Sequence, residues 1–228
     1  MVNVDGAADI DHGRCMTRRA LPAITLVLCV CLQHATAREL AAASGSEPGP
    51  LALSIGQLFV PAIRYEKGYA RHYDEQCSAT LVAQGRRSAS RLVLSAWHCI
   101  EDHRDLSRPV LFQTADGQRH IAQLVASGGA MHADWALLRL PRALPAPLPV
   151  LSGDPAASGP LRMAGFPRRT APRVLTLASG CRVTGEDGAD LRTDCVLQKG
   201  ASGGAALTDS ATPALIGVIS RGDGVTQS

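Results

Sequence analysis

Short apolar runs broken by turn residues are the sequence feature that most restricts the fold of this chain. From Leu53 onward, segments rich in Val, Ile and Leu alternate with Gly, Pro, Asp and Ser, a pattern that favours β-strands bounded by turns. After residue 37, no segment keeps the helical period for about 12 residues. The sequence therefore predicts an all-β barrel or sandwich. The expected strands are Ser78–Ala83, Arg91–Ser95, Val110–Thr114, His120–Val125, Trp135–Leu140, Leu161–Gly165, Val174–Gly180, Cys195–Leu197, Ala205–Thr208 and Ala214–Ser220.

Residues 1–37 have the composition of an export signal. Residues 16–19 carry two arginines, residues 20–32 are apolar, and residues 33–37 end in Ala-Thr-Ala. These are the basic, apolar and cleavage regions of a secretory signal peptide. The apolar run is shorter than the roughly 20 residues of a membrane span, and an uncleaved anchor or a buried helix is the alternative. Because residues 1–15 are polar, we expect synthesis to start at Met16 and the mature protein, secreted or periplasmic, to begin at Arg38 without a membrane segment.

The remaining residues divide by composition into four segments. Residues 38–54, rich in Ala, Ser, Gly, Glu and Pro, are expected to form a flexible lead-in. Residues 141–160 hold six of the 14 prolines, which excludes a helix or a central strand there. We therefore expect this segment to connect one half of the fold, residues 55–140, to the other, residues 161–228.

Charge and cysteine content restrict partners and compartment. The formal net charge is only +3, and the basic residues are scattered, which argues against a nucleic-acid partner. Of the seven cysteines, Cys15, Cys29 and Cys31 lie before Arg38, so four remain in the mature chain. An even number in an oxidising compartment predicts two disulfides and argues against free thiols or metal ligands.

Three motifs carry chemistry. His98 stands in Ser-Ala-Trp-His-Cys, Asp134 precedes Trp-Ala-Leu-Leu, and Ser202 lies in Gly-Ala-Ser-Gly-Gly-Ala. Imidazole exchanges protons near neutral pH, a buried carboxylate can orient it, and glycines allow a substrate carbonyl to approach the serine closely. Asp102, Asp105 and Asp116 compete with Asp134, but none of them leads an Ala-Leu-Leu segment.

The order His98, Asp134, Ser202 and the motifs around these residues resemble the trypsin-like (chymotrypsin-fold) serine proteases, compact bacterial members in particular, over roughly Ile55 to Gly222. The resemblance implies two packed six-stranded antiparallel β-barrels, here short or truncated at the C-terminus. His98 would be the general base and acid, Asp134 would orient it, and Ser202 would be the nucleophile. The family pairs the cysteines that match Cys77 and Cys99, and some bacterial relatives have a bridge comparable to one between Cys181 and Cys195.

The same resemblance assigns the substrate contacts. The amide N–H groups of Gly200 and Ser202 would form the oxyanion hole, and Ser220 and Gly222 would line the entrance of the specificity pocket. Val196 stands where tryptic relatives bind Arg or Lys with an aspartate, so small or apolar substrate side chains are expected. Ala201 replaces the aspartate that pairs with a freed N-terminus in animal members, so that activation switch is not expected.

These features predict a secreted serine endopeptidase that acts on a protein or peptide substrate without metal or cofactor. The alternative is a catalytically weak or inactive binding protein with the same fold. A metal site of His98, Cys99 and His103 would compete with the expected disulfide at Cys99. The Gly-x-Ser-x-Gly pattern also occurs in α/β-hydrolases, but those enzymes have their histidine after the serine, and no histidine follows Ser202.

Overall fold

The chain was studied as a computed structural model, which describes residues 49–83, 85–152, 159–168, 172–188 and 190–221. The chain divides into Met1–Gly45 and Ser46–Ser228, and all described residues belong to the second unit. The predicted signal peptide, most of the predicted lead-in and Gly222 lie outside the described residues. Within the described part, the helices are two short 3-10 turns, η1 (Pro50–Ser54) and η2 (Trp97–Cys99), so the all-β class is confirmed. No described helix has the length and apolar content to cross a membrane.

Seven strands form the first sheet, in the spatial order β5-β4-β1-β2-β3-β7-β6. Their bounds are β1 (Ile55–Glu66), β2 (Tyr69–Val82), β3 (Ala89–Ser95), β4 (Leu111–Gln113), β5 (Arg119–Ile121), β6 (Gln123–Ser127) and β7 (Ala136–Pro145). The edge strands β5 and β6 are separated in the chain only by Ala122. Since one short link joins both edges, the sheet must curl until they meet, as in a barrel. Inside it, alternate residues of β7 (Ala136, Leu138, Leu140) pack with Phe112 and Val93 in the core.

The second half of the chain forms a five-stranded sheet and a separate hairpin. The sheet has the order β10-β9-β13-β14-β8, with β8 parallel to β14. The bounds are β8 (Val150–Leu151), β9 (Leu161–Gly165), β10 (Thr176–Cys181), β13 (Ala205–Thr208) and β14 (Ala214–Val218), and the hairpin is β11 (Val183–Asp187) with β12 (Asp190–Thr193). The expectation of two six-stranded barrels is therefore met only in part. One core cluster contains Ile55 and Val82 of the first sheet together with Phe166 and Leu207 of the second half, so the two sheets share buried apolar surface.

The apolar segments of the sequence predicted most of the strands but not all of them. Strands β9 and β13 have the predicted bounds, whereas β1, β8, β11 and β12 were not predicted. The predicted strand Cys195–Leu197 is wrong, because these residues have no strand pairing. Strand β7 continues past Leu140 to Pro145, where it pairs with β3 but no longer with β6. The prolines of β7 therefore lie where the strand pairs with β3 alone, and its other edge needs no backbone N–H donor.

Both expected cysteine pairs lie at disulfide distance. The Cα atoms of Cys77 and Cys99 are 6.1 Å apart and their sulfurs are bonded. The Cα atoms of Cys181 and Cys195 are 5.2 Å apart. The first bridge ties β2 to η2, which carries His98, and the closure of a 22-residue separation removes freedom from the unfolded chain worth about 3 kcal/mol.

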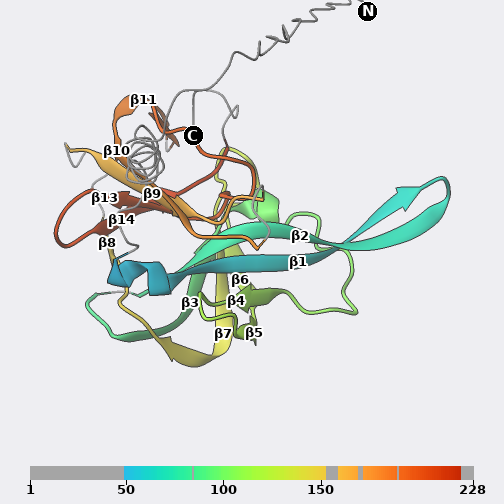
Figure 1. The fold of residues 1–228 in the computed structure, drawn as a ribbon. Helices are drawn as coiled ribbons and strands as arrows, with labels where there is room; N and C mark the ends of the chain where they lie inside the picture. Colours follow the sequence, from blue (N-terminus) through green and yellow to red (C-terminus); the bar gives the residue numbers. More distant parts are fainter. Residues whose placement is uncertain (1–48, 84, 153–158, 169–171, 189, 222–228) are drawn as a thin grey trace, which may run out of the picture. The chain divides into compact units, whose positions relative to one another are not determined.

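Strands β1 and β2 extend beyond the sheet as a two-stranded ribbon (Figure 1). Pairing of β1 with β4 ends at Phe59, and β2 does not reach β3 before Thr80. A two-residue turn at Lys67 and Gly68, with φ of 51° and 85°, closes the ribbon in the manner of a type I′ hairpin.

A buried carboxylate, Asp105, joins this ribbon to the loop after η2. It bonds to three side chains: His72 Nδ1 at 2.8 Å, Ser107 Oγ at 2.5 Å and Arg108 Nε at 2.7 Å. Arg108 also donates to Asp74 at 2.9 Å and to the Tyr73 carbonyl at 3.0 Å, both on β2. The hydrogen bonds from Ser107, His72 and Arg108 hold the pKa of Asp105 well below its usual range.

Because the folded pKa of Asp105 is lowered, its contribution to stability is complete above the unfolded pKa of about 3.9 and declines as the pH falls from there through the lower folded pKa. We expect Asp105→Asn to lower the melting temperature by several degrees at pH 7, and by less at pH 2.5. Thermal unfolding followed by circular dichroism at both pH values measures this, with the exposed Asp102→Asn as the control. An equal loss at the two pH values would contradict the assignment.

Candidate active site

His98 and Asp134 are held together by two hydrogen bonds. His98 lies in η2, directly after β3, and Asp134 lies just before β7, the strand that pairs with β3. The backbone N–H of His98 donates to Asp134 Oδ1 at 2.8 Å, and His98 Nδ1 lies 2.8 Å from Asp134 Oδ2. A carboxylate only accepts hydrogen bonds, so Nδ1 carries a proton, and in the neutral imidazole Nε2 is then the nitrogen with the free lone pair.

The carboxylate of Asp134 has a third partner. Ser220, which follows β14, donates its hydroxyl hydrogen to Asp134 Oδ2. Burial raises the pKa of Asp134, but the hydrogen bonds from His98 and Ser220 outweigh it and leave the pKa below its ordinary value. Asp134 is therefore ionised at neutral pH. Ser220 was expected at the entrance of a substrate pocket; it lines the pocket described below and also orients this carboxylate.

The segment Gly200–Gly204, called here the serine loop, is held by its backbone. The carbonyl of Lys199, directly before the loop, accepts a hydrogen bond from the Arg168 N–H at 2.8 Å. Ser78 donates twice: its Oγ to the Gly200 carbonyl at 2.8 Å and its N–H to the Ser202 carbonyl at 2.7 Å. The Ala201 carbonyl accepts from the Gly204 N–H at 2.9 Å. The N–H groups of Ala201 and Gly203 donate to Gln198 at 3.1 Å and Ile219 at 2.7 Å. Among the described residues, the N–H groups of Gly200 and Ser202 find no acceptor. The two donors expected in an oxyanion hole are thus the two that remain available in the loop.

Glycine is required at two positions of this loop. Gly200 has a φ of 98° and Gly203 a φ of 81°, a region that other residues avoid. A Cβ on Gly203 would lie 2.1 Å from the Ser78 carbonyl oxygen, and one on Gly200 would lie 2.8 Å from Arg173 Nη2. The glycines therefore let the loop approach β2 and the arginine.

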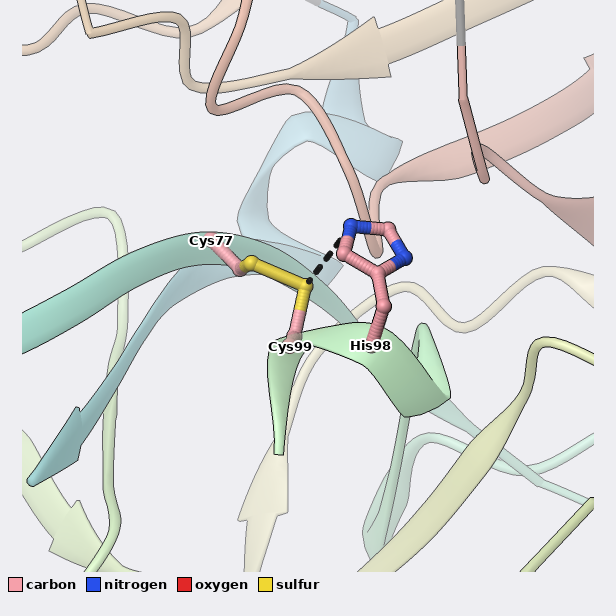
Figure 2. A group of neighbouring side chains, drawn as sticks. All are labelled: Cys77, His98 and Cys99. Atoms are coloured by element: carbon pink, nitrogen blue, oxygen red, sulfur yellow. Dashed lines mark hydrogen bonds between the residues drawn. A yellow bond between two sulfur atoms is a disulfide. The ribbon is translucent and has the colours of Figure 1, made fainter. Parts of the chain in front are cut away.

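His98 and Ser202 line one open pocket of about 330 Å³. The other lining residues are Met131, Leu197, Gln198, Lys199, Ala201, Ile219, Ser220 and Arg221. Among the described contacts, no hydrogen bond joins the Ser202 hydroxyl to His98. His98 Nε2 instead lies 3.8 Å from the sulfur of Cys99 (Figure 2). The structure thus brings the general-base candidate and the nucleophile candidate to the same pocket without a direct bond.

Val196 does not take the place expected of it. Its side chain is 56% exposed and is not part of the pocket lining, where the next residue, Leu197, is found instead. Residues 195–198 are irregular, and the position six residues before Ser202, where tryptic relatives have their aspartate, does not line the described pocket.

Cys77, His98 and Cys99 offer ligand atoms within 4.8 Å of one another (Figure 2). The two sulfurs are bonded to each other, whereas a cysteine binds zinc as a free thiolate. With the disulfide formed, this donor set does not fit a zinc ion.

Three residues of the site were not predicted from the sequence. Ser78 bonds to the Gly200 carbonyl across 122 positions of the chain, and Arg168 and Arg173 reach the same loop from the segment after β9. The proximity of Ser78 to Cys77, which lies beside His98, was the only feature that could have indicated it.

Comparisons with known proteins identify the family and support the fold. Residues 77–218, more than half of the chain, match the family described as the trypsin-like peptidase domain. Among proteins with curated descriptions, none matches the chain significantly. The structure is similar to the crystal structure of a serine endoprotease from Yersinia pestis, with a TM-score of 0.55 and 18% identity. That match covers 78% of this chain and 59% of the other, and at this identity it supports the fold alone.

Proposed function

Since this chain belongs to the family of trypsin-like peptidase domains, we propose that it is a serine endopeptidase with Ser202 as nucleophile, His98 as general base and acid, and Asp134 as the residue that orients His98. The observation that carries the proposal is that Asp134 accepts hydrogen bonds from both the backbone N–H and Nδ1 of His98, and that His98 and Ser202 line the same pocket. Because Nδ1 bonds to the carboxylate, Nε2 is the nitrogen that remains to accept the proton of Ser202.

In the reaction, the Ser202 oxygen attacks the substrate carbonyl while His98 Nε2 takes its proton. The resulting oxyanion accepts hydrogen bonds from the N–H groups of Gly200 and Ser202, each worth about 2.7–4 kcal/mol in the transition state. The C–N bond then breaks, the leaving amine receives the proton from His98, and an acyl-enzyme remains. Water, deprotonated by His98, releases the acid and restores Ser202. The bond from Ser202 to His98 forms when substrate binds, as catalytic hydrogen bonds often tighten only in the complex.

The pocket lining supports small or apolar side chains at the cleaved bond. Leu197, Met131 and Ile219 supply apolar surface, and no carboxylate is among the described lining residues. Arg221 lines the pocket too, but it is tied to Asp190 at 2.7 Å and to the Met131 carbonyl at 3.0 Å. An Arg or Lys side chain of a substrate would find no opposite charge there.

Two further properties belong to the proposal. The two disulfides fit an oxidising compartment, and together with the signal-like composition of residues 16–37 they support a secreted or periplasmic protein. Ala201 is buried and has no charge, so activity does not depend on an ion pair between this position and a new N-terminus.

A fluorophosphonate probe tests the proposal directly, because it phosphonylates only an activated serine. We expect the folded protein to be labelled, and mass spectrometry to place the adduct on Ser202. A protein that is folded by circular dichroism but is not labelled would refute the proposal and favour the alternative of an inactive binding protein.

A further inference from the structure

Arg173 lies against the serine loop, in the segment between β9 and β10. Its Nη2 donates to the carbonyl of Gly200 at 3.0 Å and to the carbonyl of Phe166, and its Nε donates to the Pro167 carbonyl at 3.3 Å. It therefore joins the end of β9 to the residue that precedes Ala201 and Ser202.

No carboxylate compensates the charge of Arg173 within the described residues. None of their ion pairs includes it, and its Nη1 is buried without a hydrogen-bond partner. Burial, followed by repulsion from Arg168, lowers the pKa of Arg173 to about 10, so it stays charged at neutral pH. A half-buried cation that bonds only to carbonyls among the described residues gives up part of its hydration without gaining an ion pair.

The carbonyl of Gly200 is held from two sides. It accepts from Ser78 Oγ at 2.8 Å as well as from Arg173, which uses both of its lone pairs. The preceding carbonyl, Lys199, accepts from the N–H of Arg168. Because a trans peptide is planar, its N–H points opposite to its C=O, so the N–H of Gly200 is turned away from Arg168. Gly200 thus lies between two peptide groups whose orientations are fixed.

We propose that Arg173 is a positioning residue for acylation: by holding the Gly200 carbonyl, it fixes the Gly200–Ala201 peptide. This peptide joins the two peptides that carry the N–H groups of Gly200 and Ser202, so its fixed orientation keeps both groups aimed at the oxyanion. The inference rests on the proposed function. It accounts for an ordered loop without an ion pair at position 201, because glycine at 200 would otherwise allow the peptide to rotate. Arg173 itself does not touch the substrate.

The test compares Arg173→Met and Arg173→Lys with Arg162→Met. Arg162 is a matched control, since it also has a buried nitrogen without a partner but pairs with Asp209 and does not contact the serine loop. Phosphonylation by the fluorophosphonate is followed at several probe concentrations, which separates the maximal rate of labelling from probe binding. Circular dichroism melts are recorded for each variant.

We expect Arg173→Met to lower the maximal labelling rate about 10- to 100-fold, a part of what loss of an oxyanion donor costs, with the half-saturating probe concentration changed less than about threefold. Arg173→Lys, which keeps charge and a donor, should recover most of the rate, and Arg162→Met should label like wild type.

The proposal is overturned if Arg173→Met labels within about threefold of wild type, or if Arg162→Met loses as much rate for an equal loss of melting temperature. If Arg173→Met does not fold, the same comparison is made with Arg173→Gln: labelling at least about tenfold slower than that of Arg162→Met supports the proposal, and labelling within about threefold of Arg162→Met overturns it. Absence of labelling in the folded wild type would refute the proposed function, and with it any role of Arg173 in acylation.

Discussion

Replacing Ser202 by alanine is expected to lower the kcat for hydrolysis of a fluorescent casein about a millionfold, the size of loss seen when a serine peptidase loses its nucleophile. The hydroxyl supplies the bond of the acyl-enzyme, and no other described hydroxyl lies in the pocket with His98 except that of Ser220, which is engaged by Asp134. Peptide binding should persist, because the pocket walls are unchanged.

The exposed Ser210→Ala is the matched control and should keep full activity. A Ser202→Ala protein that retains more than about a hundredth of the activity would assign hydrolysis to another group, or to a contaminating protease. Purification of both variants by the same procedure separates these two explanations, because a contaminant would be equal in both.

Asp134→Asn is expected to lower kcat about ten-thousandfold, with little change in KM. An amide at this position offers hydrogen atoms as well as an oxygen, so His98 would present the wrong nitrogen to Ser202 and the developing imidazolium would lose its counter-charge. The hydrogen bond from Ser220 would also have to rearrange. Steady-state kinetics at neutral pH measure the loss.

The pH dependence gives an independent check on Asp134. Its pKa lies below the ordinary value, so the carboxylate stays ionised and keeps orienting His98 above about pH 3.9. The decline of wild-type kcat between pH 8 and 5 should therefore follow one protonation rather than two. The exposed Asp116→Asn should show the wild-type profile, and a profile of Asp134→Asn that matches wild type in both height and shape would contradict the assigned role.

Strand prediction from sequence succeeded where a short segment is buried along most of its length. In β9 and β13 most residues are apolar or small, Arg162 being the exception, and Gly or Pro lies close to the ends of both strands, so the predicted bounds agree with the structure. Strand β1, which is also largely apolar in its first half, was not predicted as a strand. The outer part of β2 is polar because it pairs only within the exposed ribbon. The apolar Cys195–Leu197 is not a strand, since it leads from a disulfide into the serine loop.

The sequence by itself determined the family, the β class and the order of His98, Asp134 and Ser202, because these depend on residue types and on spacing along the chain. Only the tertiary structure decided that, in the serine loop, the N–H groups of Gly200 and Ser202 are the ones without an acceptor among the described residues. It also decided that Ser78 and Arg173 hold the Gly200 carbonyl, and that Leu197 rather than Val196 lines the pocket. The physical reason is that a backbone group bonds to whichever partner the packed sheets bring within about 3 Å, and for Gly200 one such partner is 122 residues away, beyond the reach of any local pattern.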